Sequence, residues 1–339
     1  MSLPGMDVDA LRAHLEAAGV GVEGELRVEL ISGGRSNLTF KAYDDVSTWV
    51  VRRPPTSGLT PSAHDMAREY TVTAGLQGTR VPVARNITFD AEGVALGAPM
   101  TVVEYIEGTV FRDRSELGAL TDPQLESAAD ALVATLAELH AVDYRAVGLE
   151  NFGRPEGFVA RQVALWARQW ERVKTRELAD VAALGAALSD AIPGTSESAI
   201  VHGDFRIDNA ILDSGAPHIV RAVIDWEMST LGDPLTDIAL MCVYRSPIFD
   251  VVLGVEAAWT SPRLPSPDAL AQRYATLSGR DLGSWNFYLA LANFKLGVIA
   301  EGITHRALRG SDAGDALRAA DSTPEFMAAG LRALHGKSA

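Results

Sequence analysis

The sequence predicts an α+β fold of two lobes, with a small β-rich N-terminal lobe over residues 1–107 and a larger, mainly helical C-terminal lobe over residues 108–339. Short apolar runs with period-two alternation and β-branched residues fill much of the first third of the chain. From about Thr121 onward, apolar residues recur at the spacing of amphipathic helices instead. The length of 339 residues agrees with two compact units, because a domain typically has about 100–200 residues.

The strands of the first lobe are predicted from alternation between apolar and polar residues, which indicates a mostly antiparallel sheet. The expected strands are residues 26–32, 38–44, 49–53 and 100–107. One helix is expected over residues 61–76, because Ser62 stands three residues before Asp65, which is the spacing of a capping box. Gly108 follows the last strand and ends it.

Helices dominate the second lobe. The first is expected to begin at Thr121 or Asp122 as the cap, with Pro123 in its first turn. Its apolar face is predicted to contain Leu125, Ala128, Ala129, Leu132, Leu136 and Leu139. A second helix is expected over residues 157–178, with Val159, Val163, Trp166, Trp170 and Val173 on one stripe.

Two short apolar runs interrupt this helical lobe. Residues 199–205 and 218–227 are expected to form one short hairpin, because a turn sequence stands near residues 213–215. After Asp237 the chain is expected to be helical to its end, except for the proline-rich loop 260–267.

Composition and charge exclude several functional classes. The chain has 30 Lys and Arg against 44 Asp and Glu, and its net charge of −14 disfavours general nucleic-acid binding. Cys242 is the only cysteine, so no disulfide within the chain is possible. The N-terminus lacks a secretory pattern, and no run reaches about 18 apolar residues. We therefore expect a cytoplasmic protein with no membrane contact, and the sequence leaves its oligomeric state open.

The densest group of polar residues is HGDFRIDN, residues 202–209, and it lies between two apolar runs. An aspartate followed five residues later by an asparagine, with Asp225 further along the chain, matches the H-x-D-x-x-x-x-N template of protein kinases. Asp204 is predicted to be the catalytic residue that accepts the proton of a substrate hydroxyl. Asn209 and Asp225 are predicted to bind Mg²⁺, which prefers oxygen ligands, and Glu227 offers a carboxylate for a second ion.

Other interpretations of these residues stay open. Asp and Asn are common in turns, so the motif is also compatible with a hairpin that exposes its carboxylates. We expect His202 to orient the loop by hydrogen bonding rather than to act as a base. A metal-dependent hydrolase using His202, Asp204 and Asp225 is a third possibility, although no second histidine stands at the spacing of a zinc site.

Two segments carry a resemblance to a known family. HGDFRIDNAIL (202–212) and VIDWEMSTLGDPLTDIA (223–239) resemble the aminoglycoside phosphotransferase/choline kinase superfamily. The similarity is greatest to the kinase-like domain fused to acyl-CoA dehydrogenases and to its free-standing bacterial relatives. Supporting stretches occur in the expected order at 36–41, 50–55, 61–70, 102–108, 136–143 and 158–170.

The resemblance implies a bilobal protein kinase-like fold and Mg²⁺- and ATP-dependent phosphoryl transfer. It implies a nucleotide loop that includes Gly33, Gly34, Ser36 and Asn37, although a complete G-x-G-x-x-G is absent. Arg52, or its neighbour Arg53, stands where protein kinases have a phosphate-binding lysine, and an arginine holds phosphate bidentately. Its implied ion-pair partner is Glu69, and the implied adenine-binding hinge includes Glu104 and Ile106.

The phosphate acceptor is less defined. The resemblance implies a hydroxyl of a small molecule, such as a hydroxy acid or a hydroxyacyl-CoA, with an aminoglycoside or an amino alcohol as the alternative. Arginines beside tryptophans in residues 158–176 are compatible with an anionic substrate, and equally with tryptophans in the core and arginines in solvent.

A nucleotide-binding pseudokinase or regulatory module is the alternative from another class of function. Asp233 and Asp237 are expected to brace the loop through backbone hydrogen bonds.

Overall fold

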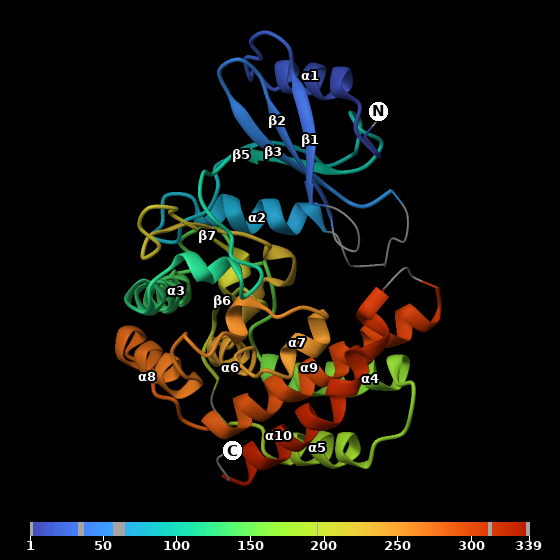
Figure 1. Cartoon of the computed structure of the whole chain (residues 1–339), viewed down its shortest axis with the longest axis vertical. Coiled ribbons are helices and arrows are strands. Elements are labelled where there is room, and N and C mark those ends of the chain that lie inside the picture. Colours follow the sequence, from blue (N-terminus) through green and yellow to red (C-terminus); the bar gives the residue numbers. More distant parts are fainter. Residues whose placement is uncertain (1–2, 33–36, 57–64, 195, 311–313, 337–339) are drawn as a thin grey trace. The chain divides into compact units, whose positions relative to one another are not determined.

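The computed structural model of the chain describes residues 3–32, 37–56, 65–194, 196–310 and 314–336. The chain divides into two compact units. The first unit consists of Met1–Glu107, Tyr144–Phe152 and Arg221–Ser229, and the second of Gly108–Asp143, Gly153–Val220 and Thr230–Ala339. The α+β class is confirmed, since the first unit is built on an antiparallel sheet and the second is mainly helical (Figure 1).

The first unit contains a five-stranded antiparallel sheet in the order β1-β2-β3-β5-β4. The strands are β1 (Arg27–Ser32), β2 (Leu38–Tyr43), β3 (Thr48–Arg53), β4 (Asn86–Asp90) and β5 (Met100–Glu104). Burial alternates strictly along β2 and β3, as the sequence pattern predicts. β4 is an additional strand that the sequence analysis did not anticipate.

One face of this sheet forms a hydrophobic core with α1 (Val8–Ala17), which the sequence analysis also did not anticipate. Leu11 and Leu15 of α1 are fully buried in this core together with Phe40 and Val51 of the sheet. The opposite face of β3 presents Val50 and Arg52, because successive side chains of a strand point to opposite faces. The core therefore fixes which way Arg52 points.

The helix α2 (Met66–Leu76) begins four residues after the predicted cap at Ser62. Asp65 has non-helical backbone angles, and its side chain accepts a hydrogen bond from the Arg68 N–H at 3.0 Å, so Asp65 is the N-cap. The predicted start is therefore wrong, and residues 61–64 lie outside the described part of the chain. α2 packs against β4 and β5, and its first turn carries the buried Glu69.

The second unit is built from helices. They are α3 (Asp122–Ala141), α4 (Phe158–Val173), α5 (Ala179–Asp190), α6 (Leu235–Val243), α7 (Phe249–Leu253), α8 (Pro267–Ser278), α9 (Trp285–Leu308) and α10 (Thr323–Leu334). The predicted cap of α3 is confirmed, since Thr121 and Gln124 form a capping box. The predicted apolar faces of α3 and α4 are also confirmed, because all the residues assigned to them are buried.

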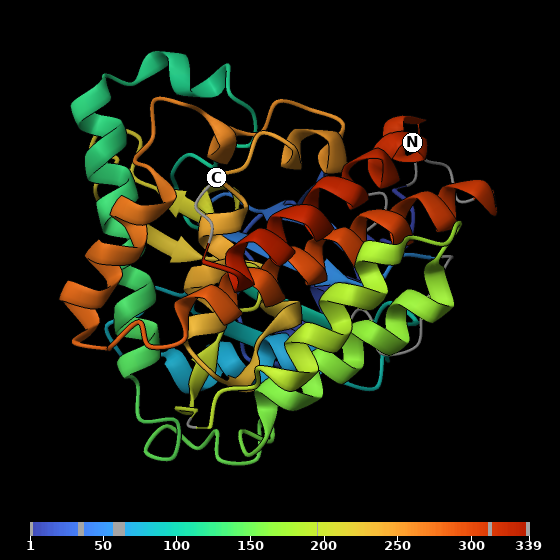
Figure 2. The ribbon, with the colours of Figure 1, turned by 90° about the horizontal axis from the view of Figure 1, so that it is seen from below.

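Four helices of the second unit, α4, α5, α9 and α10, pack side by side (Figure 2). The longest of them, α9, is long and apolar enough by composition to cross a membrane. Within the protein, however, 78% of its most apolar window is buried. Such burial is typical of a helix at the centre of a folded core.

Short strands flank the polar motif: β6 (Ala199–Val201), β7 (Ala210–Leu212), β8 (Val220–Val223) and β9 (Thr230–Gly232). β6 pairs antiparallel with β9, so the predicted pairing of residues 199–205 with 218–227 is wrong. β6 is short because Gly203 has a φ of 84°, which turns the chain out of the sheet directly after His202. Asp204 consequently lies in a loop.

Candidate active site

The loop after β6 brings Asp204 and Asn209 together in the second unit. The Asn209 Nδ2 donates to the backbone oxygen of Asp204 at 2.7 Å and to its Oδ2 at 3.0 Å. Tyr244, which caps the end of α6, donates its hydroxyl proton to Asp204 Oδ1. Arg206 approaches the same carboxylate, with its Nε 3.3 Å from Oδ1 and its Nη2 3.4 Å from Oδ2. We call these four residues the Asp204 cluster.

The amide of Asn209 is oriented by its two acceptors. Because both are oxygens, the nitrogen of the amide faces Asp204, and the Oδ1 faces away from it. Asn209 is buried, and its side-chain amide makes no other hydrogen bond to a described residue. Its amide oxygen is therefore available as a ligand for a cation.

The charge of Asp204 is set by its surroundings. Burial alone would raise the pKa of the Asp204 carboxyl, but Arg206, the Tyr244 hydroxyl and Lys295 together hold it below its usual value. The carboxylate thus stays ionised at neutral pH. An ionised carboxylate is a hydrogen-bond acceptor, which is what orienting and deprotonating a hydroxyl requires.

Arg206 is held from several sides. Its Nη1 lies 2.7 Å from Asp208 Oδ2, and its guanidinium lies 5.3 Å from the Tyr244 ring centre and 5.4 Å from that of Phe249. Burial raises the pKa of Asp208 to about 6 despite this ion pair. The sequence analysis selected neither Tyr244 nor Arg206. Tyr244 could not be selected from a local motif, because it is distant from Asp204 in the sequence and the two residues meet only in the folded chain.

A buried hydrogen-bond network fixes the loop before Asp204. Asp237 accepts hydrogen bonds from the backbone N–H of His202 at 2.6 Å and of Gly203 at 2.8 Å, as expected for a bracing residue. The Nδ1 of His202 accepts the Asp204 N–H at 3.2 Å, so the orienting role predicted for His202 is confirmed. His140 of α3 completes the network, with its Nε2 3.3 Å from Asp237 and its Nδ1 2.7 Å from the Tyr274 hydroxyl.

This network predicts a stability that depends on pH. Burial lowers the pKa of His140, against the opposing pull of Asp237. Unfolded histidine takes up a proton near pH 6.5 and folded His140 does not, so stability falls as the pH drops below about 6.5, by at most about 1.4 kcal/mol per pH unit. We expect calorimetric Tm values between about pH 6.5 and 5.5 to fall more steeply for the wild type than for His140→Gln. Parallel curves would contradict this assignment.

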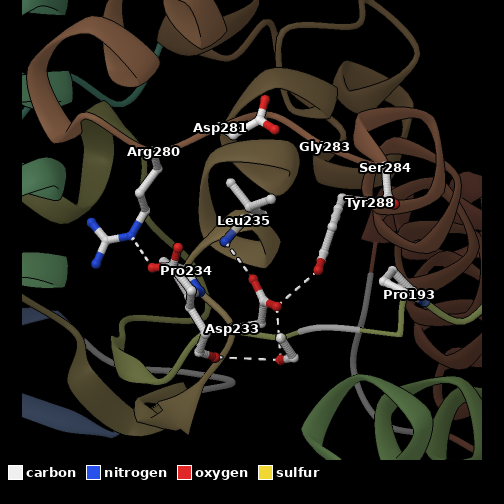
Figure 3. Close-up of a pocket in the computed structure, with 11 residues that line it drawn as sticks. Pro193, Asp233, Pro234, Leu235, Arg280, Asp281, Gly283, Ser284 and Tyr288 are labelled. Carbon is white, nitrogen blue, oxygen red and sulfur yellow. Dashed lines mark hydrogen bonds and ion pairs between the residues drawn. The ribbon is translucent and has the colours of Figure 1, made fainter.

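Asp233 holds the start of α6 and lines a pocket of about 280 Å³ (Figure 3). Its Oδ2 accepts hydrogen bonds from the hydroxyls of Ser196 and Tyr288, both at 2.8 Å, and its Oδ1 accepts the Leu235 N–H at 2.9 Å. Donors thus reach both oxygens of this carboxylate. Only the bond from Leu235 comes from the backbone, so Asp233 holds the start of α6, whereas Asp237 braces the loop at residues 202–209.

Lys295 of α9 is a further cation near Asp204 that the sequence analysis did not select. Its Nζ donates to the Gly203 carbonyl at 2.8 Å and lies 5.7 Å from the ring centre of Trp166. Burial lowers the pKa of Lys295, against the opposing pull of Asp204 and Asp237. Among the described residues, no carboxylate forms an ion pair with this ammonium group within 4.0 Å. Two of its three protons therefore have no described acceptor.

The first unit holds a second polar cluster around Arg52. The Arg52 Nη1 lies 3.2 Å from Glu69, and the Nη2 lies 3.2 Å from Asp225. The predicted Arg52–Glu69 ion pair is therefore present, and the Asn37 Nδ2 supports it by donating to Glu69 at 3.0 Å. The guanidinium of Arg53 instead binds the backbone oxygens of Gly5 and Leu96, which assigns it a structural role.

Asp225 has an unusual backbone conformation. Its φ of 66° and ψ of 61° lie in the left-handed region, which residues other than glycine rarely adopt and which is concentrated at functional sites. Carboxylate oxygens of Asp225, Glu69 and Glu227 lie within 4.8 Å of one another. Three carboxylates against one guanidinium leave an excess of two negative charges, which fits a hard divalent cation.

The remaining predicted nucleotide residues lie in the first unit. Glu104 ends β5, and its Oε1 accepts the Arg85 N–H at 2.9 Å. Ile106 follows two residues later and is half-buried. Gly33, Gly34 and Ser36 lie outside the described residues.

The tryptophans of α4 have a structural role. Trp166 and Trp170 are buried in the core of the second unit, and Arg168 and Arg172 are exposed. The interpretation in which the tryptophans pack inside and the arginines face solvent is therefore confirmed for these four residues. The candidate contacts for a substrate are instead Lys295 and the Asp204 cluster.

Comparisons with known proteins agree on one family. A family model described as "phosphotransferase enzyme family" matches residues 27–288. Acyl-CoA dehydrogenase family member 11 of Homo sapiens is 31% identical over 309 residues, which cover 90% of this chain and 39% of that protein. The chain thus spans about two fifths of the length of this curated relative.

Solved structures show the same fold. The crystal structure of a Ralstonia eutropha protein assigned as an aminoglycoside phosphotransferase has a TM-score of 0.84 and 29% identity, covering 98% of this chain and 99% of that one. A mutant of the aminoglycoside phosphotransferase APH(4)-Ia, in complex with ADP and hygromycin B, has a TM-score of 0.58 and 15% identity, covering 94% and 98% of the two chains. These likenesses confirm the fold, and the family model confirms the family, that the two polar motifs predict.

Proposed function

This chain belongs to the phosphotransferase enzyme family, and we propose that it transfers the γ-phosphate of ATP to a hydroxyl of a small molecule with the help of Mg²⁺. The observation that carries this proposal is the ionised carboxylate of Asp204, placed beside an asparagine whose amide oxygen is turned outward. A structural turn has no need of a partly buried carboxylate beside the two cations Arg206 and Lys295, because partial desolvation of a charge is costly.

Asp204 is the catalytic residue of the proposed reaction. The acceptor oxygen forms a bond to the γ-phosphorus while the bond from phosphorus to the departing ADP oxygen breaks. The proton of the acceptor hydroxyl passes to Asp204. Phosphoryl transfer needs little covalent participation from the protein, so positioning and charge neutralisation supply most of the rate enhancement.

Asn209 and Asp225 are the proposed magnesium ligands, and Glu227 is the residue for a second ion. Their oxygens fit Mg²⁺, because it is a hard cation that binds carboxylate and amide oxygens together with phosphate and water. When bound, Mg²⁺ neutralises the charge of the phosphates. Asp225 also keeps Arg52 in place through their ion pair.

The nucleotide is proposed to bind mainly through the first unit. Arg52 offers its guanidinium to the α- and β-phosphates, and Glu69 and Asn37 hold it in position. The backbone N–H groups of the loop that contains Gly33, Gly34 and Ser36 are proposed to contact the phosphates. The backbone of Glu104 and Ile106 is proposed to contact the adenine.

For the acceptor, an anionic hydroxy compound such as a hydroxy acid or a hydroxyacyl-CoA is favoured over an aminoglycoside or an amino alcohol. The specific observation is Lys295, a buried ammonium close to Asp204 that has no ion-pair partner among the described residues. A negative group on the acceptor supplies that partner, whereas a polycation is repelled. The relatives named as acyl-CoA dehydrogenases support the same class of acceptor.

The acceptor class is tested by Lys295→Met. For an anionic acceptor we expect a rise in KM of about tenfold or more, the usual effect of losing one charge-assisted hydrogen bond, and partial recovery in Lys295→Arg. Lys174→Met is the matched control, since Lys174 is a surface lysine paired with Glu171 and Glu177. An unchanged KM for anionic acceptors, or a raised KM for amino alcohols, would refute the anionic class.

The proposed activity is tested by a screen for ATP-dependent product formation across hydroxy acids, hydroxyacyl-CoAs, aminoglycosides and amino alcohols. A kinase is stabilised thermally by Mg·ATP, whereas a metal-dependent hydrolase is stabilised by the metal alone. Strong stabilisation by Mg·ATP with no product from any acceptor class would favour the pseudokinase alternative.

A further inference from the structure

Three side chains already donate hydrogen bonds to the carboxylate of Asp204. A carboxylate offers about four lone-pair positions in its plane. The Tyr244 hydroxyl donates to Oδ1, and Asn209 Nδ2 and Arg206 Nη2 donate to Oδ2. Arg206 Nε lies 3.3 Å from Oδ1 but makes no hydrogen bond to it. An alcohol that binds Oδ1 at the position of the phenol must therefore displace the Tyr244 hydroxyl.

Of the three donor residues, Tyr244 has the fewest polar contacts with described residues. Asn209 is tied by a second hydrogen bond to the backbone oxygen of Asp204, and Arg206 by its ion pair with Asp208. Within the described part of the chain, the Tyr244 hydroxyl has Asp204 as its only hydrogen-bond partner. Tyr244 also stands at the very end of α6, where the helix gives way to a turn.

The group that Tyr244 presents is chemically the group that the acceptor presents. A phenol and an alcohol both donate one O–H to a carboxylate oxygen. The side chain of Asp204 is 22% exposed, so a molecule from solvent has access to it. Water also has an O–H group, and it reaches the same carboxylate oxygen when the Tyr244 hydroxyl does not occupy it.

We propose that the Tyr244 hydroxyl holds the place of the acceptor hydroxyl on Asp204 Oδ1 and keeps water from that oxygen until an acceptor displaces it. This inference rests on the proposed function and assigns Tyr244 a role in suppressing the wasteful hydrolysis of ATP. Water at Oδ1 would attack the γ-phosphorus, pass its proton to Asp204 and release ADP and phosphate. The phenol cannot replace water in that step, because its oxygen is fixed to the ring on α6.

The test is the release of phosphate from Mg·ATP with no acceptor present, compared between the wild type, Tyr244→Phe and Tyr288→Phe. Tyr244→Phe keeps the ring contacts with Phe249 and Arg206 and removes only the hydroxyl. Tyr288→Phe is the matched control, because it also removes a buried hydroxyl that donates to a carboxylate, that of Asp233, at the other end of α6 (Figure 3). Each variant thus loses one hydrogen bond from a tyrosine hydroxyl to an aspartate carboxylate.

We expect Tyr244→Phe to release phosphate about tenfold faster than the wild type, the factor that one hydrogen bond to a charged group typically supplies. Tyr288→Phe is expected to match the wild type, and the double variant Tyr244→Phe, Asp204→Asn is expected to lose the increase. A purely structural role of Tyr244 gives the opposite sign, because a displaced Asp204 lowers phosphate release. An unchanged or lowered rate in Tyr244→Phe overturns the inference, as does an equal rise in Tyr288→Phe.

Failure of the proposed function gives a different result. In that case Mg·ATP does not raise the Tm of the wild type, and none of the proteins releases phosphate. A wild type that is stabilised by Mg·ATP, together with an unresponsive Tyr244→Phe, refutes the role of Tyr244 and leaves the phosphotransferase assignment in place.

Discussion

Asp204→Asn is expected to lower kcat by about three orders of magnitude and to leave Mg·ATP binding nearly unchanged. The substitution preserves shape and removes the charge, so the acceptor hydroxyl loses the group that orients it and takes its proton. Positioned acid–base groups typically contribute about 10²–10⁴-fold. The measurements are steady-state turnover with an acceptor found in the screen and the shift in Tm that Mg·ATP produces.

The control for this experiment is Asp213→Asn. Asp213 also lies in a loop of the second unit, and its carboxylate accepts the N–H groups of Gly215 and Ala216 at 2.9 and 2.8 Å. Removal of its charge changes local turn stability only, and we expect kcat within about twofold of the wild type. If Asp204→Asn keeps more than a tenth of the wild-type kcat, Asp204 is not the proton acceptor.

Asp225→Asn is expected to weaken Mg·ATP binding by about tenfold to a hundredfold and to raise the Mg²⁺ concentration needed for half-maximal activity. The variant removes one negative charge from the three-carboxylate cluster and one ion pair from Arg52. Asparagine tolerates the left-handed backbone conformation, so the result reports on charge rather than on strain. Titration with Mg²⁺ at fixed ATP, followed by turnover and by calorimetry, measures both quantities.

Asp90→Asn is the matched control in the same unit. Asp90 is a buried carboxylate that accepts backbone N–H groups of Val94 and Ala95 at 3.1 and 2.8 Å. Its substitution is expected to lower Tm without altering the dependence on Mg²⁺. An Asp225→Asn protein with the Mg²⁺ dependence of the wild type would contradict the assignment of Asp225 as a ligand.

The sequence predicts well those features that are set within a few residues. The Asp204–Asn209 contact follows from a spacing of five residues in one loop, and the cap of α3 follows from Thr121 and Gln124. Alternation along β2 and β3 predicts which side chains are buried. In each case a single local conformation determines the result.

Partners that are distant in sequence leave no such pattern. Tyr244 stands 40 positions from Asp204, and Lys295 stands 92 positions from Gly203, so only the packing of α6 and α9 brings them to the loop. The same reason explains the wrong hairpin. An apolar run of suitable length predicts a strand but does not determine its partner, and β6 pairs with β9.

Two elements of the first unit, β4 and α1, were missed for local reasons. β4 contains an irregularity between Asn86 and Thr88, which disturbs the alternation that identifies a strand. α1 is short and its buried stripe consists of Leu11 and Leu15 alone, although Asp7 at its start is a helix-capping residue. A pair of leucines four residues apart is a weak signal without a tertiary partner.

The two ion pairs of Arg52 account for the choice of arginine over lysine at this position. A guanidinium has several N–H groups in a rigid plane, so it reaches Glu69 on one side and Asp225 on the other at the same 3.2 Å. An ammonium is a single point of charge on a flexible stem and cannot hold two carboxylates apart in a fixed geometry. Arg52 both carries a positive charge and joins α2 to the segment at Asp225. Arg52→Lys would keep the charge and lose the connection, because an ammonium does not hold both carboxylates at once.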